Sequence, residues 1–213
     1  MSCKIFLLLH RYRFMNQMLL FIVMISCGNA ITQEKEKDIS FIDLSAKAKE
    51  AKEFCKNNSY NSEFCLLADM SIHSGKKRIF LWDFSKDTII YSGLCAHGCC
   101  DYPWASDYSK TTPTFSNTPG SHCTSLGKFK IGKRGWSSFG INVNYLLYGL
   151  DSANCKALER QIVLHSWEMV SEEEVYPSGA PEGWGCPAVS DNFMRKIDEK
   201  LKVVKEPVLL WMY

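Results

Sequence analysis

The sequence predicts a mainly β fold of the α+β class, an antiparallel β-sheet sandwich with a few flanking helices. Short apolar stretches rich in β-branched and aromatic residues recur along residues 64–96, 125–131 and 207–213, which is typical of strands. Turn-forming triplets, Ser-Gly-Lys at 74–76 and Ser-Lys-Asp at 85–87, separate several of them. Hydrophobic residues make up 46% of the 213 residues, which is enough for one domain with a buried core.

Residues 1–30 have the composition of an export leader. Arg11 and Arg13 precede an apolar run, residues 18–25, that is too short to span a bilayer as a mature helix. Two endings fit this leader. Ser26 and Cys27 resemble a lipobox, in which Cys27 would carry a lipid anchor to the membrane, whereas the small residues at 28–30 suit ordinary cleavage. The sequence therefore predicts an exported protein of the periplasm or cell envelope and leaves the lipoprotein alternative open.

A short charged linker, residues 31–44, is predicted to precede a single domain, residues 45–213. Ser45 is a candidate cap for the first helix, because a serine oxygen can accept from the free amides of a helix start. Expected elements follow in this order: helix 45–56, strands 64–70, 78–84 and 88–96, strand 125–131, a hairpin or lid over 135–150, helix 152–160, strand 161–165, a helix capped by Ser190, and strand 207–213. Between them, residues 97–121 form a long loop of the kind that is usually functional.

Two stretches about twenty residues apart carry the chemistry. The apolar run 162–164 reads as a buried strand that delivers His165 to its end, and Cys186 follows Gly185 in the stretch 183–189. A free thiol is only slightly ionised at neutral pH, so a nucleophilic cysteine benefits from an imidazole that takes its proton. We therefore predict Cys186 as nucleophile and His165 as base. Backbone amides near Gly185 and Trp184 are the expected oxyanion donors, since a glycine lets the backbone approach a reacting atom.

These motifs resemble the L,D-transpeptidase catalytic domain, in which a histidine is followed after a spacer by Ser/Thr-His-Gly-Cys. The Gly-Cys-Pro-Ala-Val stretch at 185–189 is similar to the murein L,D-transpeptidase-like branch, as are Phe115–Ser121 and Ser125–Ile131. The resemblance covers residues 64–213. It departs from the classical motif at Trp184, which replaces a histidine, and at Ala188, which replaces an arginine or asparagine.

The resemblance implies an exported cysteine acyltransferase that acts on peptidoglycan stem peptides and forms cross-links through a cysteine thioester. It also implies that Ser166 orients His165 and that His97 and Ser125 line the substrate cleft. No cofactor is required. Two alternatives stay open: an L,D-carboxypeptidase that uses water as acceptor, and a non-catalytic secreted binding module stapled by disulfides, in which Cys186 is paired.

The chain has ten cysteines, of which Cys3 and Cys27 lie in the leader. In an exported protein the default expectation for the others is disulfides, with connectivity that sequence does not give. His97, Cys99, Cys100, His122 and Cys123 are close in sequence but lack the spacing of a structural zinc site, so no metal is predicted. A net charge of +2 with no basic cluster gives no indication of nucleic-acid binding. Nothing in the sequence indicates an oligomeric state.

Overall fold

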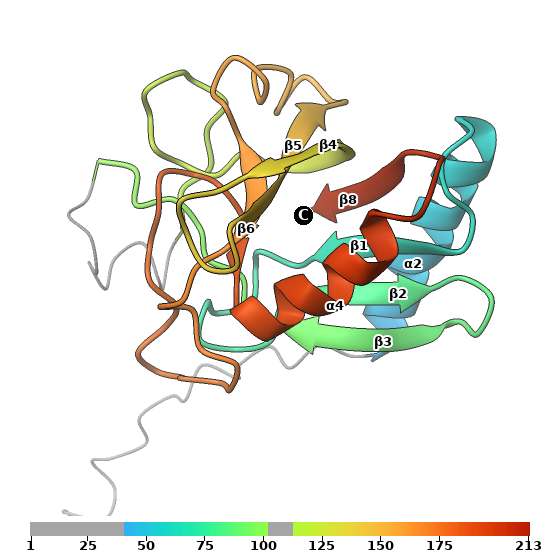
Figure 1. The fold of residues 1–213 in the computed structure, drawn as a ribbon, viewed down its shortest axis with the longest axis horizontal. Coiled ribbons are helices and arrows are strands. Elements are labelled where there is room, and N and C mark those ends of the chain that lie inside the picture. The colour runs from blue at the N-terminus through green and yellow to red at the C-terminus, as the bar shows by residue number, and fades with distance from the viewer. Residues whose placement is uncertain (1–40, 102–112) are drawn as a thin grey trace, which may run out of the picture. The chain divides into compact units, whose positions relative to one another are not determined.

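The computed structural model describes residues 41–101 and 113–213, which contain two helices and eight strands (Figure 1). The elements are α2 (Phe41–Asn57), β1 (Phe64–Ala68), β2 (Ile79–Asp83), β3 (Thr88–Gly93), β4 (Gly127–Trp136), β5 (Val143–Gly149), β6 (Val163–Ser166), β7 (Ala188–Val189), α4 (Asp191–Leu201) and β8 (Val208–Met212). This confirms the mainly β fold class. The predicted leader and Cys27 lie outside the described residues. Neither described helix is both long and apolar enough to cross a membrane.

All eight strands belong to one hydrogen-bonded sheet in the order β3-β2-β1-β8-β4-β5-β6-β7. The C-terminal strand β8 therefore lies in the middle, parallel to β1 and antiparallel to β4. At one end of the sheet β6 pairs antiparallel with β5 and parallel with β7. The hairpin predicted over 135–150 is present, because β4 and β5 pair across the connecting loop 137–142.

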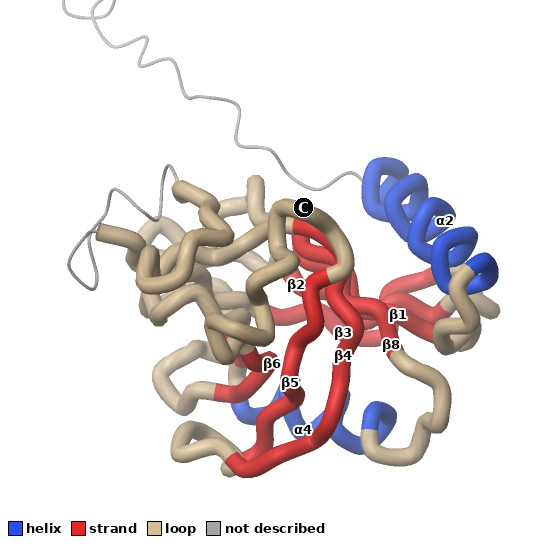
Figure 2. The backbone as a smooth tube through the Cα atoms, turned by 90° about the horizontal axis from the view of Figure 1, so that it is seen from above, coloured by secondary structure: helices blue, strands red, loops and turns tan. Residues whose placement is uncertain are grey.

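Apolar residues on both faces of the central strands explain why these stretches read as continuous hydrophobic runs. In β1, Phe64, Leu66 and Ala68 face one core cluster, whereas Cys65 and Leu67 face another. Side chains of α4 pack in the first cluster and side chains of α2 pack in the second. Figure 2 shows these two helices on opposite sides of the strands. The sheet is thus covered on both faces, as a fully buried strand requires.

The start of the first helix differs from the prediction. Helix α2 begins at Phe41 instead of Ser45, so Ser45 lies inside the helix and does not cap it. Leu44, which belongs to the additional turn, is 1% exposed and packs in the cluster beneath the helix. Burying a leucine is worth roughly 1.5–3 kcal/mol. Tertiary packing therefore extends the helix beyond the residue that local capping rules favour.

The helix predicted over 152–160 is wrong, because this segment forms a series of turns. Asn154 is fully buried and explains the difference. Its side chain accepts from the Asp151 amide at 2.9 Å and donates to the Lys128 carbonyl at 2.8 Å. Asparagine side chains offer the backbone such alternatives to helical hydrogen bonds. The segment is consequently fastened to β4 instead of coiling regularly.

The last helix, α4, begins directly after Ser190, as the sequence predicted. Ser190 caps α4 by accepting from the Phe193 amide, and Phe193, Ile197 and Leu201 repeat at helical spacing on its buried face. Val204, which extended the predicted pattern, lies beyond the helix end but still packs against the same core. The following turn leads directly to β8.

One polar cluster ties α4 to the β4–β5 hairpin. The Asp198 carboxylate accepts from Arg134 Nε at 2.7 Å, from Arg134 Nη2 at 3.0 Å and from the Tyr145 hydroxyl at 2.6 Å. The paired Arg134 guanidinium holds the pKa of Asp198 below its ordinary value of 3.8, with a further contribution from Tyr145 and some opposition from burial. This bidentate geometry fixes the helix against both strands that lead to the loop 137–142.

We predict that Asp198→Asn lowers the free energy of unfolding by about 1–3 kcal/mol at neutral pH, because a charge-assisted cluster is broken. The folded-state pKa of Asp198 is depressed, so its stabilisation is present above pH 3.8 and is lost as the pH falls through the lower folded-state pKa. Urea unfolding at neutral pH and at low pH would measure both effects. Asp87→Asn is the control, since Asp87 is exposed in a turn with positive φ that asparagine tolerates. Equal stability of the two variants would contradict the prediction.

Candidate active site

Strands β6 and β7 bring the predicted dyad together. His165 of β6 is opposite Ala188 of β7, two residues after Cys186. The Cys186 Sγ lies 3.4 Å from the amide nitrogen of Val163, which is two residues before His165 and therefore on the same face of β6. His165 and Cys186 both line one cavity of about 430 Å³. Residues that are about twenty positions apart in sequence thus meet at the same end of the sheet.

His165 is held in one tautomer by its own strand. Its Nδ1 lies 2.9 Å from the Ser166 carbonyl oxygen, an acceptor only, so Nδ1 carries the proton and Nε2 is left as the basic nitrogen. Burial lowers the pKa of His165 below its ordinary value of 6.5, opposed by the Ser166 carbonyl and the charge of Glu168. The ring is therefore neutral at neutral pH. The predicted orienting role of Ser166 in catalysis stays a prediction.

Burial raises the pKa of the Cys186 thiol above its ordinary value of 9.0. The Val163 amide and the positive charge of Arg160 act in the opposite direction but are smaller. Cys186 is half-buried and is a free thiol. Together with the lowered pKa of His165, this makes the resting pair a neutral thiol beside a neutral imidazole at pH 7.

Gly185 has φ of +99°, a conformation that residues with a side chain rarely adopt. A Cβ at this position would also overlap the carbonyl oxygen of Cys123. Within the described part of the chain, neither the Gly185 amide nor the Cys186 amide donates a hydrogen bond. Unpaired amides beside a nucleophile can stabilise an oxyanion. The oxyanion role of Gly185 and Trp184 stays a prediction.

Aromatic side chains form much of the cavity wall. Trp136 and Trp184 are 72% and 61% exposed, and both line the cavity together with Phe139 and Trp167. Phe139 stands on the loop 137–142 with its ring centroid 5.5 Å from that of His165. The Ser166 hydroxyl fastens this loop by accepting from the Ile141 amide at 2.9 Å. Trp184 stacks on His122 with ring centroids 4.9 Å apart.

Two other predicted residues lie elsewhere. His97 is 1% exposed and contacts Arg78 and Glu182 instead of lining the cavity. Ser125 is also buried, and its hydroxyl has no hydrogen-bond partner among the described residues. Neither residue is part of the cavity wall.

Sequence reasoning missed Arg160 and Thr124. Arg160 donates from Nη1 to the Ser116 carbonyl at 2.8 Å and from Nη2 to the Cys123 carbonyl, and its charge acts on the Cys186 thiol. Thr124 Oγ1 donates to the Gly185 carbonyl at 3.3 Å. Thr124 thereby contacts the nucleophile's loop directly, whereas Arg160 binds carbonyls of the neighbouring segment 116–123. Such contacts depend on the path of the chain and leave no motif in the sequence.

The cysteines differ from the default expectation of extensive pairing. Cys100 and Cys123 form a disulfide, whereas the other described cysteines are free thiols. The free thiols are Cys55, Cys65, Cys95, Cys99, Cys155 and Cys186. Several are buried in apolar surroundings with no sulfur partner, and burial raises the pKa of Cys55 to about 12 and that of Cys95 to about 11. Over residues 41–101 and 113–213, no group of His, Cys, Asp and Glu could hold a metal ion.

The sequence model of the L,D-transpeptidase catalytic domain family matches residues 28–213 of this chain. The helical cell shape determining protein Pgp2 of Campylobacter jejuni is 12% identical with a TM-score of 0.41, over 70% of this chain and 46% of that chain. An L,D-transpeptidase of Xylanimonas cellulosilytica is 9% identical with a TM-score of 0.39, over 76% of this chain and 68% of that chain. This chain thus spans about half the length of the Campylobacter protein.

No curated protein sequence matches the chain. The family model, in contrast, covers both halves of the candidate dyad and every strand of the sheet, since it extends from residue 28 to the C-terminal Tyr213. The chain therefore belongs to the L,D-transpeptidase catalytic domain family.

Proposed function

We propose that this chain is an exported L,D-transpeptidase that cross-links peptidoglycan stem peptides through a thioester on Cys186. The observation that carries the proposal is the meeting of Cys186 and His165 in one cavity, with Nδ1 of His165 tied to the Ser166 carbonyl. This is the arrangement that a base needs in order to take a thiol proton through Nε2. Membership of the family supports stem peptides as the substrate class.

In the acylation step, Cys186 Sγ attacks the carbonyl carbon of the amide that follows the third stem residue. The thiol proton moves to His165 Nε2, and the carbonyl oxygen becomes an oxyanion that can accept hydrogen bonds from the Gly185 and Cys186 amides. When the C–N bond breaks, His165 returns the proton to the departing D-alanine amine. The thioester remains on Cys186.

In the second step, an amine of a neighbouring stem attacks the thioester carbon and gives a proton to His165. The C–S bond breaks, and the Cys186 thiolate takes back the proton. If water attacks instead, the product is a shortened stem and the enzyme is an L,D-carboxypeptidase. The aromatic wall of Trp136, Phe139, Trp167 and Trp184 favours transfer, since an apolar cavity disfavours free water at the thioester.

The alternative from another class is a secreted binding module in which Cys186 belongs to a disulfide. The free thiol of Cys186 supports the enzyme over this alternative. The leader composition at residues 1–30 supports export to the periplasm or cell envelope, with lipid attachment at Cys27 as a further proposal.

We predict that incubation with a disaccharide-tetrapeptide donor adds an acyl group to the wild-type protein and that Cys186→Ala abolishes this adduct, because the substitution removes the nucleophile. Intact-mass spectrometry and product analysis measure both. Cross-linked dimers establish the transpeptidase, whereas shortened tripeptide alone identifies the carboxypeptidase. If folded protein with reduced Cys186 gives neither an adduct nor turnover, the proposal fails and the binding module is favoured.

The resting neutral pair predicts how thiol reactivity depends on pH. Since the pKa of Cys186 is raised above 9.0 and that of His165 is lowered below 6.5, iodoacetamide alkylation of Cys186 should rise steadily from about pH 6 to 9, without a plateau at low pH. Peptide mass spectrometry follows Cys186 and the exposed Cys155 in the same sample, so Cys155 serves as an internal reference. A pH-independent rate at Cys186 across this range would instead reveal a preformed thiolate and imidazolium.

Gly185→Ala should reduce the acylation rate at least about 100-fold, because it displaces an oxyanion donor. The new Cβ would meet the Cys123 carbonyl in a backbone conformation that alanine disfavours. Gly120→Ala is the matched control: Gly120 also has positive φ, at +77°, but its Cβ would enter open space away from the cavity. Stopped-flow acylation by a β-lactam of the carbapenem type compares the two variants. Similar rates in both would remove Gly185 from the proposed oxyanion site.

A further inference from the structure

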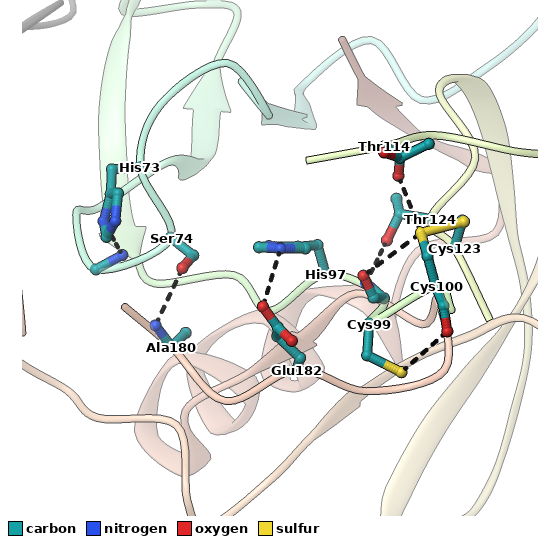
Figure 3. A network of polar contacts seen from close by, with 12 residues as sticks. His73, Ser74, His97, Cys99, Cys100, Thr114, Cys123, Thr124, Ala180 and Glu182 are labelled. Atoms are coloured by element: carbon teal, nitrogen blue, oxygen red, sulfur yellow. Dashed lines mark hydrogen bonds and ion pairs between the residues drawn. A yellow bond between two sulfur atoms is a disulfide. The ribbon is translucent and has the colours of Figure 1, made fainter. Parts of the chain in front are cut away.

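We propose that Arg78, His97 and Glu182 form a buried polar relay that positions the loop 183–186, so that His97 and Glu182 act as positioning residues for Cys186. Figure 3 shows His97 and Glu182 facing each other, with Cys99 and Thr124 in the same network. None of the three relay residues lines the cavity. The inference rests on the proposed function only in treating Cys186 as the nucleophile.

Arg78 is the fixed end of the relay. It is completely buried, and its guanidinium donates to the Cys95 carbonyl from Nε at 2.9 Å and from Nη2 at 2.6 Å, and to the Ile72 carbonyl from Nη1 at 2.9 Å. Burial lowers the pKa of Arg78 to about 10, so the side chain is still a cation at neutral pH. These carbonyls anchor the charge at the start of β2.

The contact between Arg78 and His97 fixes the imidazole tautomer. Arg78 Nη2 lies 2.8 Å from His97 Nδ1. A guanidinium has only donors, so Nδ1 must be the unprotonated acceptor and Nε2 must carry the hydrogen. His97 Nε2 lies 3.7 Å from Glu182 Oε1, and both side chains are inaccessible to solvent or nearly so. The imidazole therefore presents a donor to the carboxylate.

The buried charge of Glu182 explains why its carboxylate stays beside His97. A buried carboxylate is costly unless neighbouring groups compensate its charge. The neutral imidazole bridges the Arg78 cation and the Glu182 carboxylate. Movement of Glu182 away from His97 would take the carboxylate away from the Nε2 hydrogen, whereas Arg78 would keep its carbonyl partners. Glu182 is thereby held at one position directly before the loop that carries the nucleophile.

Backbone hydrogen bonds transmit that position to the loop. The Gly183 amide donates to the His97 carbonyl at 2.9 Å, and the Cys99 amide donates to the Gly183 carbonyl at 2.9 Å. Thr124 adds a second connection, since its Oγ1 accepts from the Gly98 amide at 3.0 Å and donates to the Gly185 carbonyl at 3.3 Å. The segment 97–99 is thus bound to both ends of the sequence 183–185. Cys186 follows immediately.

The test uses Glu182→Gln in the full domain, which removes the charge and keeps the size. We expect hydrogen exchange at the Gly183 and Cys99 amides, measured by NMR, to become at least about 10-fold faster while Leu66 in β1 is unchanged, because only the loop loses its anchor. Acylation of Cys186 by the tetrapeptide donor should fall about 10- to 100-fold in kcat with little change in KM, since misplacing a reacting group mainly affects the chemical step.

Glu173→Gln is the matched control. Glu173 belongs to the same connecting segment, is largely exposed and contacts Lys77 at 3.9 Å, so both readouts should stay at wild-type values. His97→Asn is the second variant if Glu182→Gln does not fold; it keeps an acceptor for Arg78 but is too short to reach Glu182 as Nε2 does, and it should reproduce the faster exchange. Unchanged exchange at Gly183 in a folded variant would overturn the relay. Faster exchange in a protein whose wild type shows no acylation would retain the relay and reject the proposed function.

Discussion

The pairing of β6 with the two-residue strand β7 is the interaction on which the candidate site depends. It sets His165 opposite Ala188 and leaves Cys186 beside the amide of Val163. A two-residue strand contributes few hydrogen bonds of its own, so its position must be fixed from outside. The loop 183–186 and the capped start of α4, which flank β7, provide that support.

Buried polar side chains hold several irregular segments of the chain in place. Arg78, Ser166, Thr124 and Asn154 are all nearly or fully inaccessible, and each is engaged in hydrogen bonds to backbone or side-chain groups. Segments outside helices and strands cannot satisfy their amides and carbonyls through regular ladders, so side chains must do it. These contacts also fix geometry more narrowly than apolar packing, because hydrogen bonds are directional.

Burial determines the protonation states of Cys186 and His165. Loss of water raises the pKa of the Cys186 thiol and lowers that of His165, so the two effects reinforce one another and keep both groups neutral. A neutral thiol is a poor nucleophile. In the proposed mechanism, proton transfer to His165 Nε2 and stabilisation of the developing oxyanion therefore accompany attack, and the Gly185 and Cys186 amides carry more weight than a lowered thiol pKa.

The sequence by itself determined the mainly β class, most strand positions and the Ser190 cap, and it predicted Cys186 and His165 as a dyad, because periodicity, capping and short motifs are local. It erred at Ser45 and over 152–160, where burial of Leu44 and Asn154 overrides local preference. Only the tertiary structure decided the central place of β8, the burial of His97 away from the cavity wall and the contacts of Arg160. Each of these depends on segments distant in sequence that meet through packing, which no local pattern records.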